Sequence, residues 1–287
     1  MLSEPVSEFV GLRADEGEGG QVANAHQGHG RRASLATTNT VDEIREQWRR
    51  RQAWHRAEKA LTLQAKALCR RLAEDGDKAE ADRIYKAAVG KAQHPMGDIA
   101  LAAIFPLTEA RDGIERHRKA VERRLEKLAG GLPVAPYVKA TRGVGLLSLA
   151  AIVGEAGDLG AYRNHSALWK RMGLAVMPDG SRQRRVGGAD ALDHGYSPAR
   201  RSVVWNIGAC IVKAGGPLKL AYDARKVIES ERVEAKAHAH NRAQRYVEKR
   251  FIRSLWREWR RCASAEAPGG RAADTTPAVP LPLPVAA

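Results

Sequence analysis

The chain has 287 residues, which allows one large domain or two smaller ones, so length does not exclude a substantial core. Hydrophobic residues make up 44% and aromatic residues 5%, and the many Ala, Leu, Arg, Lys and Glu residues favour helices over sheets and predict a mainly α fold. The formal net charge is +15, and three widely separated cysteines exclude a disulfide framework or a paired-cysteine zinc site.

The start of the chain and its hydropathy predict an intracellular location. MLSEPVSEF carries acidic residues where a signal peptide needs a positive flank, and no apolar stretch is long enough to span a bilayer. The high positive charge attracts polyanions, phosphate backbones above all. We therefore expect a cytoplasmic, nucleoid-associated protein with no membrane partner.

The first predicted element is a long helix. Residues 1–40 are rich in Gly, Ala, Ser, Thr and His without periodic apolar positions, so they are predicted to be disordered. A helix is expected over residues 41–72, where Asn39 and Thr40 can cap it and later apolar positions fall on one face.

A second long helix is expected before the middle of the chain. A short helical stretch surrounds residues 82–89, HPMG interrupts the chain at 94–97, and Pro106 is expected to end the apolar run 99–105. Apolar residues then recur at helical spacing in a strongly charged stretch: Ile114, Val121, Leu125, Leu128 and Leu132. This pattern predicts a helical hairpin or coiled coil that either packs on its own domain or forms a homo-oligomer through helices 41–72 and 114–132.

Most of the positive charge lies in the next module. Gly130, Gly131 and Pro133 mark the end of the helical segment 41–132. Residues 133–262 hold 24 basic and 11 acidic side chains, so the excess belongs to a compact helical domain rather than to a tail. Residues 263–287 are rich in Pro and Ala and are predicted to be a disordered tail.

A glycine turn within PYVKATRGVGLLSLAAIVGEAGDLGAY, residues 136–162, has the pattern of a helix-hairpin-helix. Gly143 and Gly145 allow a tight turn close to a phosphate, and the free N–H groups of the following helix can receive an anion. Lys139 and Arg142 stand just before the turn. The alternative is that these glycines only end a helix and allow close packing.

A basic loop follows in VMPDGSRQRRVGG, which places Arg182, Arg184 and Arg185 among glycines and polar residues. Clustered arginines can bind phosphates through paired hydrogen bonds. The alternative is a solvent-exposed run of charges without a ligand. Asp190, Asp193 and His194 lack the oxygen or sulfur ligands of a metal site, so no metal is predicted there.

The block GVGLLSLAAIVGEAGDLGAYRNHSALWKRMGLA resembles the C-terminal domain of insertion-sequence transposases of the IS-one-ten, IS-one-sixteen and IS-nine-oh-two family. The shared pattern joins a Gly-x-Gly hairpin, an apolar helix, a Gly-Asp-hydrophobic turn, an aromatic-Arg pair and a Gly-Leu-Ala close. HNRAQRYVEKRFIRSLWREW is similar to the closing basic helix of the family, so the resemblance covers residues 133–261. It implies a DNA-binding protein of a mobile element that acts in DNA transposition or recombination.

The resemblance also implies a nucleophile. Family members carry a serine eight positions after the glycine of Gly-Leu-Ala, and here Gly173 leads to Ser181. Ser181 would attack a phosphodiester while the neighbouring arginines neutralise charge. The alternative is a turn serine after Asp179 and Gly180.

Several features depart from the family. Val176 replaces a proline, Arg182 replaces a glycine, and the family's Lys-Arg-Gly-Asn element is reduced to GYSPARR at 195–201. Complete members begin with a RuvC-like domain whose carboxylates hold divalent metals, and no strand-like run ending in aspartate occurs in the N-terminal half. No cofactor is evident in this chain, and the resemblance implies Mg²⁺ only where a separate RuvC-like partner supplies the site.

Three functions remain open at this stage, and one of them is a structural or RNA-assembly protein that binds folded RNA in preference to duplex DNA. Another is a transposase-related DNA-binding protein with Ser181 as its nucleophile and with DNA and a structured guide RNA as the partners that the resemblance implies. The third is a non-catalytic nucleic-acid-binding module that dimerises through its helical segment. The predicted nucleic-acid contacts are Lys139, Arg142, Gly143, Gly145, Arg163, Lys170, Arg171, Arg182, Arg184, Arg185, Arg200 and Arg201.

Overall fold

The computed structural model describes residues 35–265, and within this range the protein is helical with no strand beyond an isolated bridge between Val176 and Arg182. The predicted mainly α fold is confirmed. The elements are α1 (Leu35–Arg70), η1 (Glu74–Gly76), α2 (Lys78–Ala88), α3 (Gly97–Gly130), α4 (Ala135–Ala140), α5 (Leu146–Ala156), η2 (Leu159–Ala161), α6 (His165–Arg171), α7 (Asp190–His194), α8 (Pro198–Ala214), α9 (Pro217–Arg232) and α10 (Lys236–Ala265).

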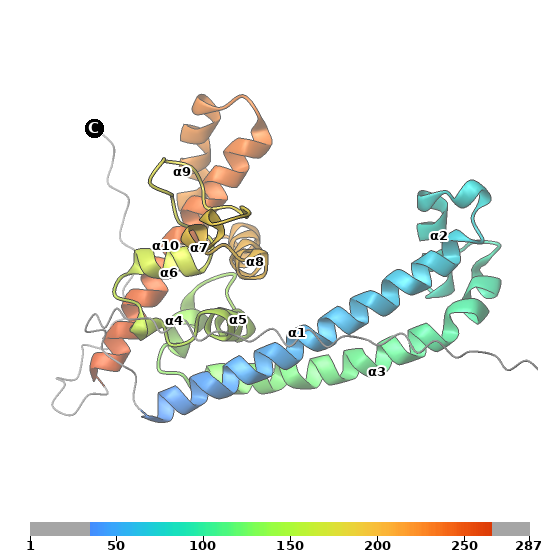
Figure 1. The fold of residues 1–287 in the computed structure, drawn as a ribbon, viewed down its shortest axis with the longest axis horizontal. Coiled ribbons are helices and arrows are strands. Elements are labelled where there is room, and N and C mark those ends of the chain that lie inside the picture. Colours follow the sequence, from blue (N-terminus) through green and yellow to red (C-terminus); the bar gives the residue numbers. More distant parts are fainter. Residues whose placement is uncertain (1–34, 266–287) are drawn as a thin grey trace, which may run out of the picture.

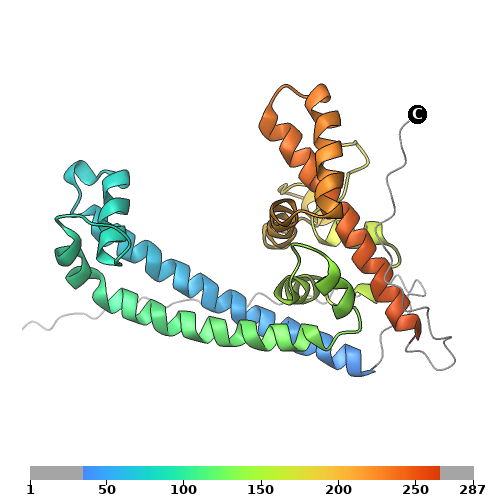
Figure 2. The same cartoon turned by 180° about the vertical axis from the view of Figure 1, so that it is seen from behind.

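A long arm formed by α1 and α3 projects from a compact body of α4 to α10 (Figures 1 and 2). The two helices run antiparallel, and α2 lies at the far end of the arm. The predicted helical hairpin is therefore present. No helix in residues 35–265 is long and apolar enough to cross a membrane.

Two predicted boundaries of the arm are wrong, the start of α1 and the stop at Pro106. Helix α1 begins at Leu35, so the last residues of the segment expected to be disordered are helical, while residues 1–34 lie outside the described part. Helix α2 agrees with the helical stretch expected around residues 82–89, and it begins at Lys78 because the Asp77 carboxylate accepts hydrogen bonds from the N–H groups of Ala79 and Glu80. Pro106 lies inside α3 and does not end it. Its ring is exposed, and packing of α3 against α1 and α2 holds the helix on both sides.

The arm has an apolar core at each end and a polar middle. At the tip, seven buried residues form one cluster: Ala65, Cys69, Ile84, Tyr85, Ala88, Ala100 and Ile104. At the root, Val41, Ile44 and Trp48 of α1 and Leu125 and Ala129 of α3 belong to the core of the compact body. The modules expected at 41–132 and 133–262 therefore share one core, since the root of the arm is built into the body.

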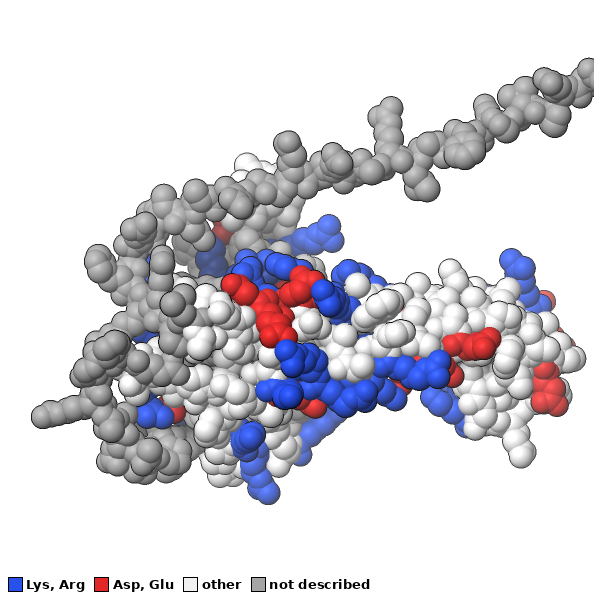
Figure 3. Space-filling model, turned by 90° about the horizontal axis from the view of Figure 1, so that it is seen from below, with Lys and Arg blue, Asp and Glu red and all other residues white. Residues whose placement is uncertain are grey.

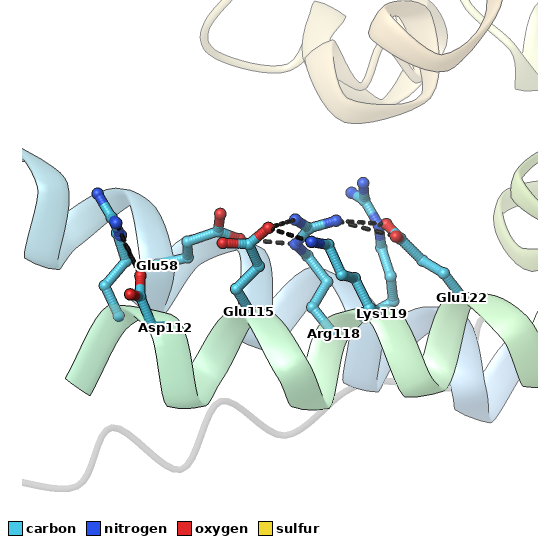
Figure 4. A network of polar contacts seen from close by, with 8 residues as sticks. Glu58, Asp112, Glu115, Arg118, Lys119 and Glu122 are labelled. Carbon is cyan, nitrogen blue, oxygen red and sulfur yellow. Dashed lines mark hydrogen bonds and ion pairs between the residues drawn. The ribbon is translucent and has the colours of Figure 1, made fainter. Parts of the chain in front are cut away.

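Ion pairs join the two helices in the middle of the arm (Figure 4). The guanidinium of Arg118 donates to Glu58 at 2.6 Å and to Glu122 at 2.9 Å. Arg51 also donates to Glu122, at 2.9 Å. The Trp54 and His117 rings stack beside them with centroids 5.4 Å apart. Contact between α1 and α3 in the middle of the arm therefore depends on these ion pairs and not on buried apolar side chains.

The compact body matches the predicted order of a short helix, a glycine turn and an apolar helix, which are α4, residues 141–145 and α5. Its core is closed by α10, which contributes the fully buried Phe251, Ile252 and Leu255. Helix α10 continues to Ala265, so residues 263–265 of the expected tail are helical, and residues 266–287 lie outside the described part.

Candidate nucleic-acid interface

The predicted contact residues fall into three places. Lys139, Arg142, Gly143 and Gly145 surround the glycine turn between α4 and α5. Arg163 precedes α6, and its carbonyl accepts a hydrogen bond from Arg260 of α10 at 3.5 Å. The third group gathers around the start of α8 and the loop before it: Lys170, Arg171, Ser181, Arg182, Arg184, Arg185, Arg200 and Arg201.

The two glycines of the turn have different surroundings. Gly143 has φ +82°, and a Cβ there would lie 2.7 Å from the Cys210 carbonyl oxygen and from Ile211 Cα. Gly143 therefore allows the turn to lie against the backbone of α8. Gly145 is exposed with open space around it, and it begins α5 without a side-chain cap. The first amides of α5 consequently face outward and can receive an anion.

The basic loop is a short hairpin that is held at its base by Gln183. Because it carries Arg182, Arg184 and Arg185, we call it the arginine hairpin. The Gln183 side chain is buried, accepts from the Ala175 N–H at 3.1 Å and donates to the Lys170 carbonyl at 3.0 Å. It also donates to the carbonyl of His194 at 2.5 Å. Because Gln183 points inward, its neighbours Arg182 and Arg184 point outward and are exposed. Sequence reasoning missed this residue, since an isolated glutamine among arginines gives no signal of burial.

Ser181 lies in the tight turn at the tip of this hairpin. Its carbonyl accepts from the Met177 N–H at 2.8 Å, and its own N–H donates to the Asp179 carboxylate at 2.9 Å. Gly180 has φ +76°, as a type I turn followed by a bulge requires. Hydrogen bonds from the N–H and then the hydroxyl of Ser181 lower the pKa of Asp179, which makes this carboxylate a weak base. The geometry is that of a turn serine on an exposed cationic loop.

Two carboxylates anchor the arginines at the start of α8. Arg200 Nε lies 3.8 Å from Glu155, which also accepts from the Trp48 indole at 2.8 Å. Arg201 Nη2 lies 2.9 Å from the fully buried carboxylate of Glu248 in α10. That oxygen has no well-aligned donor among residues 35–265, so the contact is an ion pair rather than a hydrogen bond. Arg201 is therefore tied to the interior, whereas Arg200 is only partly withdrawn from solvent.

The glycine turn and the arginine hairpin lie at opposite ends of α8. Gly143 packs beside Cys210 and Ile211, near the end of α8, whereas Arg201 stands in its first turn. Ten residues of helix separate Arg201 from Ile211, which corresponds to about 15 Å. Apart from Arg163, the predicted contacts thus form two separate sites that only an extended ligand can touch together.

The carboxylates of the compact body are largely occupied by internal contacts. Asp158 accepts from the Trp259 indole at 2.8 Å, Glu229 pairs with Arg225 and Arg242, and Glu258 pairs with Arg261. Exposed cations that have no ion pair among the described residues include Lys139, Arg142, Arg163, Lys170, Arg182, Arg184 and Arg185. The positive charge of the body is therefore displayed at its surface. Lys and Arg also lie along the middle of the elongated molecule, with Asp and Glu beside them, when it is seen from below (Figure 3).

The histidines and acidic residues of this region have structural contacts. His194 Nδ1 accepts from the Arg184 N–H at 3.5 Å, beside the exposed Asp190 and Asp193 of α7. The ring of His240 contacts the Tyr222 hydroxyl at 2.6 Å. No group of three or more His, Cys, Asp or Glu side chains within 35–265 is arranged to hold a metal ion.

The chain matches no protein-family model, no curated protein and no solved structure.

Proposed function

We propose that the protein binds nucleic acid through the phosphate backbone, as a transposase-related protein of a mobile element acting in DNA transposition or recombination. The arginine hairpin carries this proposal. Arg182, Arg184 and Arg185 are exposed and have no ion pair in the described part of the chain, while Gln183 fixes the hairpin on α6 and α7. Guanidinium groups held on a fixed loop bind phosphates bidentately at a low entropic cost.

The glycine turn supplies a second backbone contact. The exposed start of α5 at Gly145 offers free amides, and Lys139 and Arg142 stand exposed beside it. Contacts of this kind position a duplex and carry no sequence information. About 15 Å separates this turn from the start of α8, so the two sites together favour an extended duplex over a small anion.

The arm is proposed as the surface for a second copy of the chain. Its mainly polar middle carries Trp54, which is 37% exposed, and the half-buried Leu61 and Ile114. An oligomer through helices 41–72 and 114–132 would place two basic bodies on one nucleic acid.

Salt-dependent duplex binding tests the proposed function. We expect fluorescein-labelled duplex DNA to bind with an affinity that falls steeply with salt, and Arg184→Gln/Arg185→Gln to weaken binding about tenfold and flatten the salt slope by roughly two. Arg232→Gln/Lys236→Gln removes two exposed charges at the junction of α9 and α10 and serves as the matched control. Equal affinity for the hairpin variant and the control would contradict the proposal.

A second candidate is the serine chemistry that the family resemblance implies. Its support is the position of Ser181 at an exposed hairpin tip beside Arg182. Incubation with nicked or branched DNA, with and without magnesium, should then give a covalent protein–DNA product on a denaturing gel. Loss of this product in Ser181→Ala, with duplex affinity unchanged, supports the nucleophile. Duplex binding without any covalent product would mean that Ser181 is a turn serine in a DNA-binding protein and not a nucleophile.

A further inference from the structure

The outer face of α10 carries a row of cations that the arginine hairpin does not include. Lys249, Arg253, Arg257 and Arg260 recur at spacings of four, four and three, which places them on one side of the helix. Arg253 and Arg257 are exposed, and none of the four has an ion pair among residues 35–265. The row extends for about 16 Å along the axis of α10. We call these four residues the α10 row.

Aromatic rings from α6 and α10 hold the two ends of this row. Lys249 Nζ lies 5.0 Å from the centroid of Trp169, and the Arg260 guanidinium lies 4.9 Å from that of Trp256. Both indoles are fixed by hydrogen bonds, from Trp169 to the Lys249 carbonyl and from Trp256 to the Tyr162 carbonyl. The two cations are thus held in place before any ligand arrives, which reduces the entropy lost on binding.

His165 lies between the two indoles. Its ring centroid is 4.6 Å from that of Trp169 and 5.9 Å from that of Trp256, in edge-on geometry. Burial, then the charges of Arg253 and Arg257, lower the pKa of His165 below its ordinary value, which favours the neutral imidazole. A half-exposed aromatic ring beside exposed cations offers a stacking surface next to phosphate-binding groups.

Carboxylates do not compete for these cations. Glu258 is the acidic residue of α10 in this stretch, and Arg261 holds it through both carboxylate oxygens at 3.1 and 3.0 Å. Asp158, the N-cap residue of η2, accepts hydrogen bonds from the Trp259 indole and the Gly160 amide. The row therefore attracts an external polyanion.

We propose that the α10 row and His165 form a binding surface for single-stranded nucleic acid, separate from the duplex contacts of the arginine hairpin. A duplex presents phosphates and buries the faces of its bases, so it uses cations only. A single strand uses both the cations and the aromatic ring, because its unpaired bases can stack. The mixture of free cations and rings on α6 and α10 fits the single strand.

Binding of labelled oligothymidine, oligouridine and duplex DNA to the full chain tests this surface. We expect Arg253→Gln/Arg257→Gln to weaken single-strand binding about tenfold and duplex binding less than about twofold. His165→Ala, which removes the ring but no lysine or arginine charge, should weaken single-strand binding about fivefold through lost stacking. Arg232→Gln/Lys236→Gln is again the charge-matched control, and circular dichroism confirms that each variant is folded.

The outcomes separate this proposal from the duplex-binding function. Loss of single-strand binding with duplex binding retained supports the proposal, and comparison of the thymidine and uridine strands shows whether DNA or RNA is preferred. Equal losses on duplex and single strand, or no loss in a folded variant, overturn it. If duplex binding is lost only in Arg184→Gln/Arg185→Gln, the arginine hairpin binds the duplex independently of the α10 row.

Discussion

The indole of Trp48 in α1 lies directly on the backbone of Gly154 in α5, so closely that a Cβ on Gly154 would be 2.4 Å from Trp48 Cγ. The same indole donates to Glu155 at 2.8 Å. Since Trp48 belongs to the arm and α5 to the body, this contact makes the root of the arm part of the core of the body. The direction in which the arm leaves the body is therefore set by packing.

Gly154→Ala is expected to destabilise the protein. The added methyl group meets the first atoms of the Trp48 side chain, which cannot turn away, and overpacking of this kind costs about 1–3 kcal/mol. That cost outweighs the gain of about 1 kcal/mol in helix propensity. Urea unfolding measures the change. Gly187→Ala, with no atoms within 4 Å of the new Cβ, is the control, and equal midpoints for the two variants would contradict the packing argument.

Arg118→Ala is expected to loosen the middle of the arm and to leave the body unchanged. The substitution removes the bonds to Glu58 and Glu122 in a region without buried hydrophobic residues. We expect opening of the arm to become easier by about 1–2 kcal/mol. Amide hydrogen exchange should rise in the middle of α1 and α3 but stay unchanged in α8. The exposed Arg123 has no ion pair in the described region, so Arg123→Ala should leave exchange unchanged in both places.

Periodicity and charge predicted the helical arm and the basic body because both depend on local patterns. The continuation of α3 through Pro106 was missed, since packing of the helix on both sides overrides a local breaker signal. Gly143 and Gly145 look equivalent in sequence, yet only Gly143 is packed against α8. The inward orientation of Gln183 and the pairing of Arg201 with Glu248 depend on tertiary contacts that no local spacing encodes. Charge counting therefore found the basic region but not which cations are free.

Glu248→Gln is expected to change how stability depends on pH. Burial, the largest effect, raises the pKa of Glu248 above its ordinary value of 4.5 despite the nearby Arg201. The folded state therefore holds this proton more tightly than the unfolded state. The stabilisation is fully present below pH 4.5 and is lost as pH rises through the raised pKa.

Urea unfolding at a series of pH values from 4.5 upward measures this effect. The difference in the free energy of unfolding between wild type and Glu248→Gln should move in favour of the variant as pH rises, because glutamine does not ionise. A difference that stays constant with pH would show that Glu248 has the same pKa in both states.

Gln183→Ala is expected to weaken duplex binding without removing a charge. The side chain holds the hairpin through the Lys170 and His194 carbonyls, so its loss frees the loop and raises the entropy lost when Arg182 and Arg184 bind phosphate. We expect a loss of about fivefold in affinity together with faster amide exchange over residues 176–188. Faster exchange with unchanged affinity would show that order in the hairpin does not contribute to binding.

Substitutions in the glycine turn should separate a packing glycine from a contact glycine. Gly143→Ala introduces a side chain at φ +82° and within 2.7 Å of the Cys210 carbonyl oxygen, which belongs to the backbone and cannot move aside. We expect a loss of about 2–4 kcal/mol in the free energy of unfolding.

The free energy of unfolding of Gly145→Ala should stay within about 0.5 kcal/mol of wild type, because its φ of −104° suits any residue and the space around it is open. If the first amides of α5 contact phosphate, Gly145→Ala should still weaken duplex binding about threefold, since its methyl group stands next to the bound anion. Urea unfolding and duplex titration of both variants measure these effects. A destabilised Gly145→Ala variant, or one with the duplex affinity of wild type, would contradict this division of roles.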